Sequence, residues 1–175
     1  MYAVGPLNGL TGEITVIDGD IFISQVDEEG KIVIKNTFAV SAPFLVYATM
    51  PSKVEYKIPD SVSDLHSLEK YLAEVYRSRN ETPFPFEIHC NANAATIHIV
   101  NLSLDVSDHG SAHDKIQFHI ENKAVVVIGF YSAQHKGIFT HHDSNMHLHL
   151  ITQDKTMMGH VDDLRFSNAV ITLSK

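Results

Sequence analysis

Polar and apolar side chains alternate along most of this sequence, with the period of two that is typical of half-buried β-strands. The segment Asn145–Ile151 shows this alternation clearly, whereas the unbroken apolar run Ala124–Phe130 predicts a central strand that is buried on both faces. Asp-Gly and Glu-Gly pairs between the first apolar segments indicate hairpin turns. We expect strands at Glu13–Ile17, Ile21–Val26, Lys31–Ile34, Val46–Tyr56, Phe86–Cys90, Thr96–Leu104, Ile116–Ile120, Ala124–Phe130, Asn145–Ile151, Met157–Leu164 and Ala169–Leu173.

One segment has a helical period instead. The apolar residues with this spacing are Leu65, Leu68, Leu72 and Val75. They predict a helix over Val62–Arg77, with Ser61 or Ser63 as its N-cap. The chain is therefore expected to be α+β, with mixed, mostly antiparallel sheets and one clear helix. We expect a single domain over residues 1–175, or two halves, about 1–82 and 83–175, that share a continuous sheet.

Three histidines near the end of the chain are spaced to meet at one point. His147 and His149 lie two residues apart on the expected strand Asn145–Ile151, so their side chains face the same way. If the hairpin is symmetric about its polar turn at residues 153–156, His149 lies directly opposite His160 on the next strand. Opposed Cβ atoms in such a pair are about 4.5–5.5 Å apart. The three imidazoles are then within reach of a single metal ion.

Three imidazoles with no obvious fourth protein ligand resemble a catalytic zinc site, because a structural zinc site normally has four protein ligands. Zinc is the metal we expect, one ion per chain, although Mn, Fe, Ni and Cu also accept imidazole nitrogen. The alternative is that the two neighbouring histidines simply form the polar face of a strand. The lone Cys90 has no partner for a disulfide or a thiolate metal site.

Composition narrows the range of partners. The net charge is −8, and no cluster of lysine or arginine is present, which argues against nucleic acid and anionic membranes. The longest apolar run is too short to span a bilayer, and no basic residue precedes Lys31 as it would in a secretory signal. We therefore expect a soluble, cytoplasmic protein, and neutral or cationic partners stay open.

With these residues in place, the chain resembles the α-acetolactate decarboxylases over about residues 5 to 175. The segments that carry the resemblance are Gly9–Glu13 with Asp18-Gly19, Gly129-Phe130, Lys136-Gly137-Ile138, His147–Ile151, Asp154, Gly159-His160-Val161 and Asp163. The resemblance implies that His147, His149 and His160 are the zinc ligands and that Glu13 is the active-site glutamate. It also implies a homodimer and an acetolactate-decarboxylase-like fold.

Two departures from the family pattern concern the substrate. The family has a substrate-binding arginine at the position that a rough alignment gives to Val100, and His98 faces the same way and is a candidate to replace it. A purely structural role for His98 is the alternative. The family's C-terminal tail, which supplies another glutamate, has no counterpart up to Lys175. The roles of His135, His141 and His142 are left open by the sequence.

The resemblance implies a zinc-dependent lyase that decarboxylates a small 2-hydroxy-3-oxo acid such as α-acetolactate, with acetoin and carbon dioxide as products, as in acetoin biosynthesis. A buried Glu13 would have a raised pKa and could pass a proton to the carbon that loses carbon dioxide. An exposed carboxylate at a strand edge is the alternative for Glu13. Two other functions remain open: a zinc enzyme acting on a different small carbonyl compound, or a non-catalytic metal-bound binding or oligomerisation module like the plants-and-prokaryotes-conserved domain.

Overall fold

The computed structural model describes residues 1–80, 82–102, 115–140 and 144–175, and these form two antiparallel sheets and one α-helix. The α+β prediction is confirmed. The first sheet has the strand order β4-β3-β2-β1-β5. Its strands are β1 (Tyr2–Pro6), β2 (Glu13–Ile17), β3 (Asp20–Val26), β4 (Ile32–Asn36) and β5 (Val46–Ala48), and a short 3₁₀ helix (Asn8–Leu10) joins β1 to β2.

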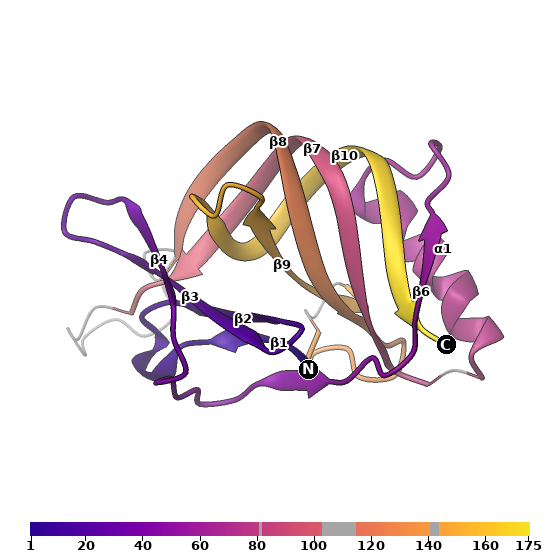
Figure 1. Cartoon of the computed structure of the whole chain (residues 1–175), viewed down its shortest axis with the longest axis horizontal. Helices are drawn as coiled ribbons and strands as arrows, with labels where there is room; N and C mark the ends of the chain where they lie inside the picture. The colour runs from indigo at the N-terminus through magenta and orange to yellow at the C-terminus, as the bar shows by residue number, and fades with distance from the viewer. Residues whose placement is uncertain (81, 103–114, 141–143) are drawn as a thin grey trace.

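The second sheet has the order β6-β10-β7-β8-β9, and β10 also pairs with β9. Its strands are β6 (Lys53–Lys57), β7 (Phe84–Val100), β8 (Lys115–Tyr131), β9 (Met146–Thr152) and β10 (Met158–Ser174). Because β10 pairs with both β7 and β9, the strands β7 to β10 form a closed ring (Figure 1). The strand β6 joins this second sheet although it precedes the helix in sequence. How the chain divides into domains stays a prediction.

Three strands of the second sheet are far longer than expected, at 17 residues each. The sequence predicted two short strands in place of each. In the structure Asn122 and Asn168 have positive φ values of 51° and 53° within β8 and β10. Asparagine tolerates this left-handed conformation better than most residues. The long strands therefore bend at these points without ending, which lets the sheet curve.

The strand β1 was not predicted, because its five residues include Gly5 and Pro6 and show no alternation. It nevertheless lies inside the first sheet, where it pairs with β2 and β5. A side chain at Gly5 would come within 2.9 Å of the carbonyl oxygen of Phe44. Close packing against Phe44 thus explains why a glycine interrupts the pattern by which this strand could have been predicted.

The helix α1 (Leu65–Ser78) begins slightly later than expected. Its N-cap is Asp64, and neither Ser61 nor Ser63 has that role. The backbone N–H of Ser67 donates to Oδ1 of Asp64 at 2.7 Å, and the N–H of Asp64 donates to Oγ of Ser67 at 3.1 Å. This reciprocal pair is a capping box, with serine in the place of the more usual glutamate.

The two faces of the second sheet are covered by different elements. The buried residues Leu68, Leu72 and Tyr76 of α1 pack against one face, where they belong to the main hydrophobic cluster. The first sheet covers part of the opposite face, where Tyr2 and Val4 contact Ile128 and Phe130. The three histidines lie on the face that meets the first sheet, as shown below. In the described part of the chain, no helix is both long and apolar enough to cross a membrane.

Gly129 lies at the most crowded point of the helix-facing core. It pairs with Phe86 on one side and Leu148 on the other. A Cβ atom at this position would overlap the ring of Phe86 and lie 2.6 Å from Cδ2 of Leu148. Such overpacking typically costs about 1–3 kcal/mol.

We predict that Gly129→Ala lowers the free energy of unfolding by about that amount, as measured by urea denaturation. In a Phe86→Leu background the same substitution should cost less, because the shorter side chain leaves room for the methyl group. An equal cost in both backgrounds would contradict the predicted overlap with Phe86.

Candidate metal centre

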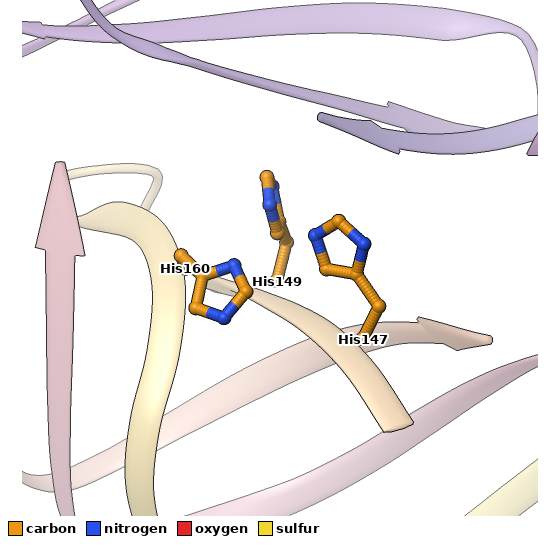
Figure 2. A group of neighbouring side chains, drawn as sticks. All are labelled: His147, His149 and His160. Carbon is orange, nitrogen blue, oxygen red and sulfur yellow. The ribbon is translucent and has the colours of Figure 1, made fainter. Parts of the chain in front are cut away.

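The three predicted histidines come together between β9 and β10. His149 lies opposite His160 in the antiparallel register, so the predicted pairing is confirmed. One nitrogen from each of His147, His149 and His160 lies within 4.8 Å of the others. All three side chains are buried, and Figure 2 shows the imidazoles pointing toward one another from the two strands.

Hydrogen bonds fix the orientation of two of these rings. Nδ1 of His147 donates to the carbonyl oxygen of Phe139 at 2.8 Å, so the lone pair of that ring is on Nε2. Nδ1 of His149 lies 3.0 Å from Oγ1 of Thr15, on β2. Metal-binding histidines usually hold their second nitrogen in this way.

His149 provides the clearest sign that the group suits a metal ion. Its Nε2 atom is fully buried and has no hydrogen-bond partner in the described part of the chain. Burial, together with the charges that His147 and His98 would carry if protonated, lowers the pKa of His149 well below its usual value. The ring is therefore neutral, which is the form that binds metals. A buried polar atom left without a partner is costly, and a metal ion would satisfy it.

Glu13 faces the same group from the first sheet. Its side chain is buried within the central strand β2, so the interpretation as an exposed strand-edge carboxylate is wrong. Oε2 lies 3.6 Å from Nε2 of His149, and Oε1 accepts a hydrogen bond of 3.1 Å from the backbone N–H of Val100. Burial raises the pKa of Glu13 to about 8, although the bond from Val100 and the charge of Lys115 oppose this rise. Glu13 can therefore hold a proton at neutral pH.

His98 lies beside the three histidines. It pairs with His160 across β7 and β10, and the two ring centroids are 4.7 Å apart. Nδ1 of His98 lies 2.7 Å from Oδ1 of Asp162, whose other oxygen accepts a 2.9 Å bond from Gln117. Burial opposes ionisation of Asp162, but the bonds from His98 and Gln117 lower its pKa below the usual value. The Asp162 carboxylate therefore orients a buried imidazole.

A cavity of about 380 Å³ brings these groups together. Glu13, His98, His147 and His160 line it, together with Lys115 and the apolar side chains of Phe44, Ile138 and Phe139. A larger cavity of about 530 Å³ lies between Phe22 and Cys90 and contains none of the three histidines. We assign the chemistry to the smaller cavity, because several titratable groups and two of the three candidate metal ligands, His147 and His160, line it.

Sequence reasoning missed several residues that shape this site. Thr15 could have been found, because it lies two residues from Glu13 and shares its face of β2. Asp162 follows His160 by two residues, yet the family resemblance named only its neighbour Asp163. No sequence pattern indicates that the carbonyl of Phe139 and the side chain of Lys115 lie at this site, because their positions depend on how distant segments pack.

The sequence left the roles of three further histidines open, and the structure describes one of them, His135. Nδ1 of His135 lies 2.8 Å from Oγ of Ser132, and the His135 ring stacks on Phe139, which in turn binds His147. His135 thus contacts the site through Phe139, and it does not line the cavity. His141 and His142 lie outside the described residues.

Comparison with known proteins agrees with this geometry. The sequence profile of the family described as Alpha-acetolactate decarboxylase matches residues 2–175. The α-acetolactate decarboxylase of Brevibacillus brevis is 25% identical over 175 residues, which cover 98% of this chain and 58% of that protein. The chain thus spans a little over half the length of that relative.

Two solved structures share the fold. The α-acetolactate decarboxylase from Bacillus subtilis strain 168 superposes with a TM-score of 0.78 at 20% identity, covering 99% of this chain and 72% of that one. A Staphylococcus aureus protein of unknown function, similar to α-acetolactate decarboxylase, gives a TM-score of 0.70 at 12% identity, covering 98% of this chain and 71% of that one. With the profile match extending over nearly the whole sequence, the chain belongs to the α-acetolactate decarboxylase family.

Proposed function

We propose that this protein is a zinc-dependent decarboxylase that converts a small 2-hydroxy-3-oxo acid such as α-acetolactate to acetoin and carbon dioxide. The observation that carries the proposal is a group of three buried imidazoles beside a buried carboxyl group, at a cavity that the carboxyl group and two of the imidazoles line, in a member of this family. Homodimer formation and a cytoplasmic location stay predictions.

His147, His149 and His160 would hold the metal ion. Three neutral imidazoles are the ligand set of many catalytic zinc sites. When bound, a divalent ion supplies Lewis acidity, which stabilises negative charge as it develops on substrate oxygen atoms. The Thr15 hydroxyl and the Phe139 carbonyl would keep the His149 and His147 rings in their orientations.

Glu13 is the proposed proton donor. Decarboxylation breaks the bond between the carboxylate and C2, and the bonding electrons move toward the neighbouring ketone. A proton must then be added to C2 to give acetoin. Glu13 is suited to this step because burial raises its pKa and its Oε2 lies 3.6 Å from Nε2 of His149. The backbone N–H of Val100 holds the other carboxyl oxygen in place.

His98 is the proposed substrate-binding residue. Because Nδ1 of His98 donates to Asp162, its Nε2 is the ring nitrogen that can contact a substrate. This atom suits the C2 hydroxyl of a 2-hydroxy acid better than a carboxylate, because the negative charge of Asp162 lies close by. His98 would then act by orienting the hydroxyl group.

The ligand assignment predicts that His149→Ala lowers the affinity for zinc by more than about 100-fold, since loss of outer-sphere partners alone costs about 10–100-fold. Titration calorimetry or metal analysis after dialysis measures the change. His119→Ala is the matched control, because His119 is an exposed histidine of β8 that is absent from the three-histidine group. Wild-type zinc affinity in folded His149→Ala would contradict the assignment.

The proposed reaction predicts that the purified protein, loaded with zinc, forms acetoin from racemic α-acetolactate. Removal of the metal with a chelator should abolish product formation, and added zinc should restore it. Acetoin is measured against the spontaneous rate without protein. Metal binding without acetoin formation would argue against decarboxylation of acetolactate and would favour another small carbonyl substrate or a binding module.

The role of Glu13 predicts that Glu13→Gln lowers kcat by about 10²–10⁴-fold while zinc content is unchanged, because the amide keeps the size and the Val100 hydrogen bond but donates no proton of comparable acidity. Steady-state kinetics and metal analysis on the same sample separate these effects. A wild-type kcat in the zinc-loaded variant would rule out proton donation by Glu13.

A further inference from the structure

Lys115 lies at the opening of the histidine cavity and has no role in the chemistry described so far. It is the only lysine or arginine among the described residues that line this cavity. As the first residue of β8, it pairs with Val100 on β7, whose N–H holds Glu13. Lys115 therefore lies one strand away from the residue that anchors the proposed proton donor.

The direction of the Lys115 side chain follows from its neighbours. Lys115 and Gln117 lie two residues apart on β8 and share a face. Gln117 donates to Asp162, which in turn orients His98, and His98 pairs directly with Gln117 across the ladder. Lys115 thus lies on the same face of the sheet as Gln117 and His98.

The charge of Lys115 is not neutralised by an ion pair in the described part of the chain. Its ammonium group is nevertheless close enough to Glu13 and Asp162 to favour the ionised form of both carboxyl groups. Asp162 already has its two partners in His98 and Gln117, and Glu13 is held by Val100. Among the described residues, this positive charge at the cavity therefore has no carboxylate within ion-pair distance.

We propose that Lys115 binds the carboxylate of the small hydroxy acid that enters this cavity, and that it selects anionic over neutral ligands. The inference rests on the proposed function, because it assigns a group to the carboxylate of that substrate. It also separates two tasks: His98 faces the hydroxyl group, and the exposed ammonium of Lys115 faces the carboxylate.

The chemistry of decarboxylation decides which kinetic constant should change. The carboxylate loses its negative charge as carbon dioxide departs, so an ammonium group stabilises the bound substrate at least as much as the transition state. Loss of Lys115 should therefore raise KM and leave kcat nearly unchanged. A charged hydrogen bond at a partly solvated site corresponds to about a tenfold change.

The test compares the wild type with Lys115→Met and Lys115→Arg, and uses Lys123→Met as the matched control. Lys123 is also a lysine of β8, but it lies outside this cavity and pairs with Asp154 at 2.6 Å. Two readouts are taken on zinc-loaded protein. One is KM and kcat for acetoin formation. The other is calorimetric binding of two ligands. The first is 2,3-dihydroxy-2-methylbutanoate, which keeps the carboxylate but lacks the 3-oxo group of the substrate. The second is butane-2,3-diol, its counterpart without the carboxylate.

We expect Lys115→Met to weaken binding of the acid and to raise KM about tenfold, with no change for the diol. Lys115→Arg and Lys123→Met should resemble the wild type. Added salt should weaken binding of the acid to the wild type, because it screens the attraction between the Lys115 ammonium and the carboxylate. It should have little effect on binding of the acid to Lys115→Met, which lacks this charge.

The outcomes separate this inference from the decarboxylase proposal. Equal acid affinity and KM in the wild type and Lys115→Met would overturn the role of Lys115 while acetoin formation still supported the decarboxylase. Acid binding that depends on Lys115 without acetoin formation would support Lys115 and reject the reaction. No binding of the acid to the wild type, or equal weakening by Lys123→Met, would also overturn the inference.

Discussion

The antiparallel pairing of β9 with β10 is the constraint on which the site depends. It places His149 opposite His160, and the two-residue period of β9 adds His147 on the same face. A shift of one residue in this register would turn the histidine face of one strand into the core. The register is held on both sides, because β8 pairs with β9 from Tyr131 to Val125 and β7 pairs with β10 from His98 onward.

The first sheet converts this histidine face into an enclosed site. It contributes Thr15, which lies against the ring of His149, and Glu13, which reaches the same ring from the adjacent position on that face. Covering the histidines removes water from them, and the same burial lowers the pKa of His149 and raises the pKa of Glu13. The packing of one sheet on another thus accounts for the environment of both the candidate metal ligand His149 and the proposed proton donor Glu13.

Much of this arrangement follows from local sequence patterns. The α+β class, the helix and the pairing of His149 with His160 depend on short-range periodicity, and all three were predicted. The continuous long strands were not, because Asn122 and Asn168 look like turn residues and their left-handed conformations bend a strand only in the context of its neighbours. Strand β1 and the position of Lys115 at the cavity were not predicted for a related reason. Both depend on contacts between segments that are far apart in the sequence, which a local pattern does not show.

The central claim is that His147, His149 and His160 share one metal ion. X-ray absorption spectroscopy at the zinc edge of the metal-loaded protein tests this most directly, because it counts imidazole ligands and measures their distances in solution. The account predicts three imidazole nitrogens at about 2.0–2.1 Å with the remaining coordination from light atoms such as oxygen. A spectrum with fewer than three imidazoles, or with a sulfur ligand, would contradict it.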